Sequence, residues 1–193
     1  MFGFLNQFRF SKEVFAIVFI AYCACYFFVS FVVTPIQMAA GFPQTSFASL
    51  LFLPHGVRVL SIWLYQARAV LPLFCAHLLV YPIFWLGEIT LSNLGLVLVG
   101  TFCAPLAFTL IGWVGFDVSV GNTKIIHWRS ILLMGFIASI INSLGNSFIL
   151  SPNIDPSLHL LTAATYLFGD TMGVFVLLLI MLFGFRLTRE YRG

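Results

Sequence analysis

Long apolar runs alternate with short polar connections along this chain. The apolar runs lie near residues 14–33, 47–66, 69–86, 91–115, 130–150 and 158–185. Each has about the length that a helix needs to cross the hydrocarbon core of a bilayer, ~20 residues. The pattern therefore predicts an all-α, polytopic integral membrane bundle of about six transmembrane helices.

The composition agrees with this pattern and excludes several classes of protein. Hydrophobic residues make up 61% of the 193 residues and charged residues only 8%, far from the composition of soluble globular domains. Little chain is left for a soluble catalytic domain or a nucleic-acid-binding module. We divide the chain into a cytoplasmic interfacial segment at 1–13, a transmembrane domain at 14–185 and a basic cytoplasmic tail at 186–193.

The basic residues predict the orientation of the bundle. Apart from Arg58, every Lys and Arg precedes the first span, follows the sixth, or lies between spans 2 and 3 or spans 4 and 5. The connections near 34–46, 87–90 and 151–157 carry no basic residue. Because cytoplasmic loops are enriched in Lys and Arg, we expect both termini in the cytoplasm.

Two charged residues fall inside the apolar runs. Arg58 lies near the middle of the second span and Asp170 near the middle of the sixth, so both are expected at one depth in the membrane. A charge at the bilayer centre costs roughly 2.5–3.5 kcal/mol on insertion scales. We therefore predict an ion pair between Arg58 and Asp170.

Other polar residues lie at similar depths and are expected to complete the hydrogen bonds of this cluster. They are His55, His77, Asn142 and Asn146. Four interpretations stay open: a salt bridge that sets helix register, a ligand or ion site, a proton relay, or a metal site. No chain of carboxylates continues to either surface, and the spacing of His55, His77 and Asp170 matches no metal-binding motif.

Small residues predict where helices approach each other closely. Gly169 and Gly173 form a small-xxx-small spacing in the sixth span. The fifth span carries Gly135 and Ser139 at the same spacing, in line with Asn142 and Asn146. We expect the fifth and sixth spans to pack along these two faces. Pro54 and Gly56 weaken the second span close to Arg58, as in the broken helices that often build membrane binding sites.

Motifs of known enzymes are missing from the sequence. It contains no His-Glu-x-x-His, no Gly-x-Ser-x-Gly, no phosphate-binding loop and no paired acidic motif for prenyl diphosphates. We therefore expect a protein without catalytic activity, cofactor or metal.

Two short motifs resemble those of a bacterial family. The segment Phe52–Val57, with Arg68 and Pro72 after it, is similar to the Pro- and Gly-containing motif of the first-described type of membrane-associated sensor domain. The segment Tyr166–Val174 resembles that family's second motif, an aromatic-rich Gly-Asp-x-x-Gly on a late helix. The resemblance extends loosely from about residue 45 to 185. The chain differs in carrying Leu53, His55 and Arg58 in the first motif.

The resemblance implies an integral-membrane sensory or interaction module, because such domains usually feed a cytoplasmic histidine kinase or cyclic-di-GMP output domain. We expect a non-enzymatic sensor, scaffold or accessory subunit of a membrane protein complex in the bacterial inner membrane. Its expected partners are the lipid bilayer, another membrane protein and a small-molecule ligand, and no nucleic acid. The alternative is a small-molecule-binding transport subunit with a mid-membrane polar site, comparable to the six-helix substrate-capturing subunit of vitamin importers.

Overall fold

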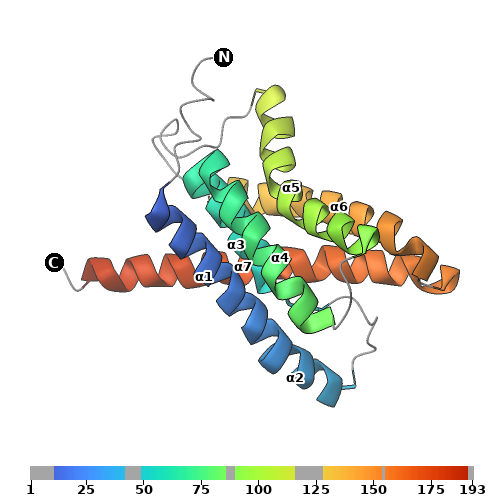
Figure 1. Ribbon diagram of the computed structural model, residues 1–193. Coiled ribbons are helices and arrows are strands. Elements are labelled where there is room, and N and C mark those ends of the chain that lie inside the picture. Colours follow the sequence, from blue (N-terminus) through green and yellow to red (C-terminus); the bar gives the residue numbers. More distant parts are fainter. Residues whose placement is uncertain (1–10, 42–48, 86–89, 116–127, 154, 191–193) are drawn as a thin grey trace.

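The computed structural model describes residues 11–41, 49–85, 90–115, 128–153 and 155–190. Most of the expected interfacial segment at 1–13 and the last residues of the basic tail therefore lie outside the described part. Within it the chain is helical and contains no strand. Figure 1 shows helices α1 (Lys12–Phe28), α2 (Thr34–Ala39), α3 (Leu53–Tyr65), α4 (Val70–Trp85), α5 (Leu91–Trp113), α6 (Trp128–Leu150) and α7 (His159–Glu190).

Five helical stretches of the described residues are long and apolar enough to cross a membrane: Lys12–Ala39, Leu53–Val80, Leu91–Trp113, Trp128–Leu150 and Pro156–Gly184. The structure thus establishes an all-helical chain with several membrane-length helices. The six expected spans differ from these five at one place. Two expected spans, 47–66 and 69–86, fall largely within the stretch Leu53–Val80.

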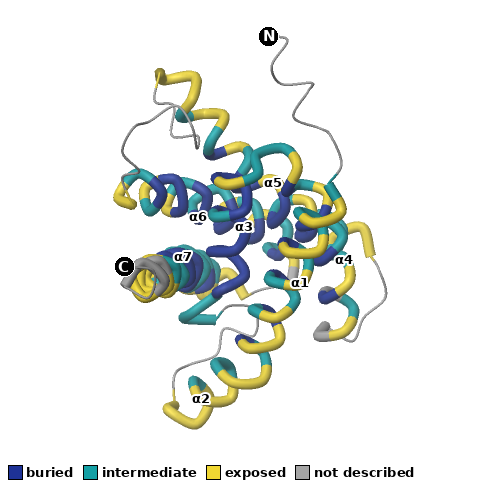
Figure 2. The backbone as a smooth tube through the Cα atoms, turned by 90° about the vertical axis from the view of Figure 1, so that its left-hand side faces the viewer, coloured by how far each residue is buried: buried dark blue, intermediate teal, exposed yellow. Residues whose placement is uncertain are grey.

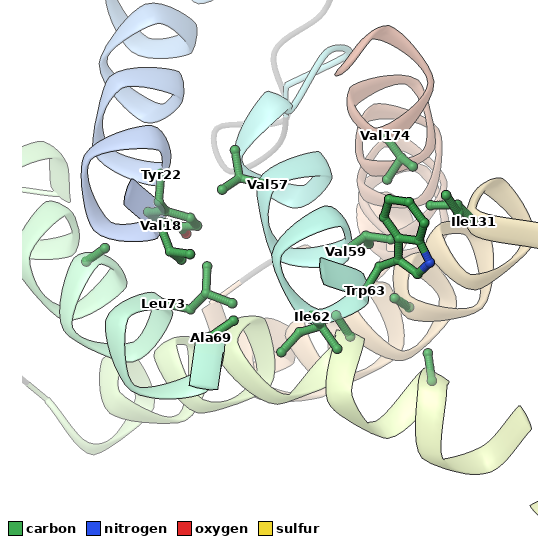
Figure 3. Close-up of a cluster of buried hydrophobic side chains, with 14 of the residues drawn as sticks. Val18, Tyr22, Val57, Val59, Ile62, Trp63, Ala69, Leu73, Ile131 and Val174 are labelled. Carbon is green, nitrogen blue, oxygen red and sulfur yellow. The ribbon is translucent and has the colours of Figure 1, made fainter. Parts of the chain in front are cut away.

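That stretch is not straight. Gln66, at the end of α3, has φ 53° and ψ −133°, and a 3-10 turn, Gln66–Ala69, leads into α4. Figure 3 shows the chain descending through Val57 and Ile62 and returning through Ala69 and Leu73. A residue with this backbone conformation cannot continue a helix, so α3 and α4 form a hairpin. α1 packs against both arms.

The first helical stretch begins at a conventional cap and is interrupted once. Ser11 accepts a hydrogen bond from the backbone N–H of Val14 at 3.4 Å, as helix N-caps do. α1 passes through one π-helical turn, Val29–Val33, into α2. Since π-helical turns widen a helix locally, this stretch is expected to be deformable near its middle.

α5 contains Pro105 near its middle, and Figure 1 shows the helix changing direction along its length. A proline inside a helix removes one backbone hydrogen bond and clashes with the preceding turn. Pro105 therefore accounts for the bend. The bend separates the N-terminal half of α5, which packs on the bundle, from the C-terminal half, which ends at the exposed Trp113.

α3 lies at the centre of the molecule, and Figure 2 shows buried residues gathered along it. All of its residues from Leu53 to Val59 are buried. Figure 3 shows Trp63 of α3 beside Val174 of α7 and Ile131 of α6, with Tyr22 of α1 on the other side. The outer surface is apolar as well, as in Phe31, Leu160 and Phe148, which suits contact with lipid.

The connection between α6 and α7 is a compact turn. Asp155 accepts hydrogen bonds from the backbone N–H of Ser157 at 2.8 Å and from its hydroxyl at 2.6 Å. These bonds stabilise the ionised carboxylate and lower the pKa of Asp155 below its usual range. The turn starts the stretch that continues into α7.

Candidate functional site

The polar centre of the molecule is built around the first turns of α3, which carry His55 and Arg58. The side chains of both are buried, at 0% and 2% exposure. α3 begins at Leu53 with Pro54 in its first turn, where proline is favoured because its missing N–H has no helical partner. The residues before it, Ser49–Leu51, are not helical, so the expected second span starts as a helix later than the hydropathy pattern predicts.

The non-helical segment Ser49–Phe52 packs on the glycine face of α7. The backbone N–H of Phe52 donates to the carbonyl of Gly169 at 3.0 Å. A Cβ atom at Gly169 would collide with the carbonyl oxygen of Ser49, and one at Gly173 with that of Phe52. From the other side, Gln37 of α2 accepts hydrogen bonds from the Ser49 hydroxyl at 3.3 Å and the Leu50 N–H at 3.4 Å.

This arrangement corrects one expectation and agrees with another. α6 and α7 do pack against each other, and a Cβ at Gly135 would lie 2.8 Å from the Val174 side chain of α7. However, Gly169 and Gly173 do not form the matching face of that contact. Instead, they leave room for the backbone that leads into α3. The carbonyl groups of this backbone occupy the space that a glycine-replacing side chain would need.

The acidic half of the centre is formed by Asp170 of α7. Its Oδ2 accepts a hydrogen bond from Asn142 Nδ2 at 2.6 Å, and His55 Nδ1 lies 3.5 Å away. Asn146 donates to Asn142 Oδ1 at 3.3 Å. The expected residues Asp170, His55, Asn142 and Asn146 therefore lie together, linking α3, α6 and α7.

The other side of the His55 ring faces α6. Its Nε2 lies 3.3 Å from the Gly135 carbonyl oxygen and 3.3 Å from Ser139 Oγ. The Ser139 hydroxyl donates to the Gly135 carbonyl at 2.9 Å, and Thr171 donates to Ser139 at 3.4 Å. Ser139, expected as a packing residue, thus also belongs to the polar network.

The basic half of the centre points away from Asp170. Arg58 Nη2 donates to the hydroxyl of Tyr22 at 2.9 Å, and the guanidinium carbon lies 5.6 Å and 5.5 Å from the ring centres of Tyr22 and Phe52. Both rings offer cation–π stabilisation. Among the described residues, the basic side chain within salt-bridge distance of the Asp170 carboxylate is His55, which is charged only when protonated. The predicted Arg58–Asp170 ion pair is therefore wrong.

His77 of α4 belongs to the basic half. Its ring centre lies 5.7 Å from that of Tyr22. A Cβ at Gly100 of α5 would lie 2.9 Å from both Arg58 Nη2 and His77 Nδ1. Gly100 therefore leaves room for these two side chains, and His77 lies on the Arg58 side of the cluster rather than beside Asp170.

Several buried atoms of the centre have no hydrogen-bond partner within the described part of the chain. They are His55 Nδ1, Arg58 Nε and Nη1, His77 Nδ1, Asn146 Oδ1, Ser147 Oγ and Asp170 Oδ1. Buried polar groups are nearly always hydrogen-bonded in folded proteins. The centre therefore has capacity for further donors and acceptors in both halves.

A metal does not fit this geometry well. Among the described residues, no group of three His, Cys, Asp or Glu side chains could hold a metal ion. The metal alternative considered for His55, His77 and Asp170 fails because His77 lies with Arg58 rather than with Asp170.

Sequence reasoning missed two residues of the centre, Tyr22 and Gly100. Tyr22 is fully buried at 0% exposure, although it lies in an apolar run together with other aromatic residues. A tyrosine carries a hydroxyl that needs a partner when buried, and this was the available signal. Gly100 gave no signal, because its role depends on helices that meet only in three dimensions.

The chain matches no protein-family model, and searches of curated proteins and of solved structures found no similar protein. The likeness to membrane-associated sensor domains consequently stays a prediction that rests on the two motifs.

Proposed function

We propose that this chain is a non-enzymatic integral membrane subunit with a sensory or accessory role in a protein complex of the bacterial inner membrane. The observation that carries the proposal is the polar centre, which lies inside a bundle whose surface is apolar. Its side chains come from α1, α3, α4, α6 and α7. A change in the hydrogen-bond partners of these side chains would therefore affect most of the helices together.

We also propose that the chain crosses the membrane six times. The hairpin at Gln66 supports this, because it turns the chain back after α3. Arg68 lies in that turn, as a cytoplasmic connection between two spans would require. In Figure 1 the start of α1 and the end of α7 lie on the same side of the bundle, which supports termini on one side of the membrane.

A partner membrane protein is part of this proposal. α7 has 32 residues and is therefore about 48 Å long, whereas the hydrocarbon core measures about 30 Å. Its candidate span ends at Gly184, and Leu187 beyond it is 66% exposed. An exposed leucine on a helix that continues past the membrane is a natural contact for a partner chain.

Purification in mild detergent tests the proposal. A partner should co-purify in fixed stoichiometry, and Leu187→Glu should release it. Leu160→Glu is the matched control, because Leu160 is an exposed leucine at the opposite end of the same helix, at 83% exposure; this variant should retain the partner. A chain that always runs as a free monomer, or a partner that is insensitive to Leu187→Glu, would contradict the proposal.

A transport subunit that captures a small molecule is the second candidate function. The unpartnered atoms of Arg58, His77 and Asp170 favour it, because a polar ligand could satisfy them near mid-membrane. Ligand-induced thermal stabilisation that Arg58→Ala abolishes would support this candidate, and a variant that still responds normally would exclude this site.

A further inference from the structure

The guanidinium group of Arg58 has more donors than the surrounding chain uses. One of its five N–H groups is bonded to Tyr22. Nε and Nη1 have no acceptor among the described residues, which leaves three N–H groups unused. The side chain is 2% exposed, so bulk water does not reach these groups freely. A buried cation in this state is costly unless an acceptor, and preferably an anion, is supplied.

The carboxylate that could have supplied it is engaged elsewhere. Asp170 Oδ2 is held by Asn142 at 2.6 Å and faces His55. Arg58 is surrounded instead by the rings of Tyr22 and Phe52, by His77 and by the backbone at Gly100. The Cys103 thiol also lies beside the guanidinium, and none of these groups is an anion. The surroundings of Arg58 are built for an anion that the described chain does not provide.

We propose that Arg58 anchors an occluded site for a small monovalent anion of the carboxylate class. The anion accepts hydrogen bonds from Nε and Nη1 of Arg58, the two nitrogens without an acceptor among the described residues. The rings of Tyr22 and Phe52 lie beside the guanidinium, and the single guanidinium favours one negative charge over two. The inference rests on the proposed sensory function, for which it names the class of ligand.

Thermal unfolding of the purified protein in detergent tests this site. Acetate replaces gluconate, a carboxylate too bulky for an enclosed site, at constant sodium concentration. The melting temperature should rise with acetate and saturate, as expected for a ligand that binds the folded state. Arg58→Gln should remove the rise. Arg129→Gln should keep it, because Arg129 is exposed and stacks on Trp128. An equal rise in Arg58→Gln, or no saturable rise in the wild type, would overturn the proposal.

Tyr22→Phe provides a second test that does not depend on the folding of the Arg58 variant. It removes the neutral acceptor of Nη2 and keeps the ring, so the anion becomes the main partner of Arg58. Acetate should then stabilise the protein at lower concentrations than in the wild type. An unchanged or weaker response would contradict the site.

These outcomes separate the anion site from the proposed function. A partner that co-purifies with a protein insensitive to acetate overturns the anion site and leaves the sensory function standing. An acetate response that depends on Arg58, in a protein that never binds a partner, supports the site and contradicts the function.

Discussion

Asp170 is the residue on which the polar centre depends most. It joins α7 to Asn142 of α6 and to His55 of α3, and its 1% exposure leaves water little access. Removing one partner of such a buried group leaves the others unsatisfied, which costs about 1–3 kcal/mol and more when the group is charged. The contribution of Asp170 to stability is therefore expected to exceed that of any surface charge.

Two substitutions of Asp170 separate its shape from its charge. Asp170→Ala should lower the free energy of unfolding by about 1–3 kcal/mol, measured by denaturation in mixed micelles. Asp170→Asn should cost less, because its amide oxygen can still accept from Asn142. Equal losses in both variants would show that the charge alone matters, contrary to the hydrogen-bonded arrangement described above.

Gly173 is important because it has no side chain, which allows the backbone of a neighbouring segment to approach α7 closely. Its Cα faces the carbonyl of Phe52, and the Gly173 carbonyl oxygen lies 2.6 Å from the Cβ position of Gly56. Neither neighbour is a flexible side chain that could move aside.

Gly173→Ala should destabilise the protein by about 1–3 kcal/mol, the usual cost of overpacking. Gly112→Ala in α5 is the control, since a Cβ there has nothing within 4 Å; it should be neutral or slightly stabilising because alanine favours helix. Denaturation of both variants in the same detergent gives the comparison. If Gly173→Ala were as stable as Gly112→Ala, the close approach of Phe52 to α7 would be wrong.

At the level of elements, the hairpin between α3 and α4 turns on one unusual residue. Gln66 has a positive φ and an extended ψ, a region that residues other than glycine rarely occupy and that costs of order 1–3 kcal/mol. The strain is tolerated because the arms are held by α1 and by the core around Trp63.

Gln66→Gly should therefore raise the free energy of unfolding by about 1 kcal/mol, part of the strain that a glycine avoids. Gln66→Ala should leave stability nearly unchanged, because alanine is strained as much as glutamine. Thermal unfolding of the two variants side by side is the measurement. A loss of stability in Gln66→Gly would indicate that the hairpin has another geometry.

The helices themselves were largely predictable from the sequence, whereas their contacts were not. α4, α5 and α6 begin and end within about two residues of the expected ranges, because apolar length alone fixes them. The start of α3 was missed because the apolar run continues through Ser49–Phe52, although Pro54 in the first turn is a local sign of a helix start. The cluster of Asp170, His55 and Asn142 was expected from the free-energy cost of a charge in the membrane and from the similar depths of these residues along their spans. The partner of Arg58 was not, because depth does not tell which face of α3 a side chain occupies.

On the scale of the whole molecule, the positions of the turns relative to the membrane follow from the number of times the chain crosses it. The hairpin at Gln66 and the distribution of basic residues both favour six crossings. The turn at 66–69 and the turn at 151–158 would then lie on opposite sides.

Cysteine labelling of intact cells or oriented vesicles can test this threading. In a background without the native cysteines, Ala67→Cys should react only from the cytoplasmic side and Ser157→Cys only from the outside. Leu94→Cys, near the start of α5, should follow Ser157→Cys. Labelling of residues 67 and 157 from the same side would contradict the six-crossing topology.

We propose that a bound anion, and not Asp170, completes the hydrogen bonds of Arg58. An experimental density map of the protein purified from native membranes tests this most directly. We expect non-protein density against Nε and Nη1 of Arg58, with Asp170 held by Asn142 and His55. A map in which the Arg58 guanidinium contacts the Asp170 carboxylate, with no density beside it, would rule out the anion site.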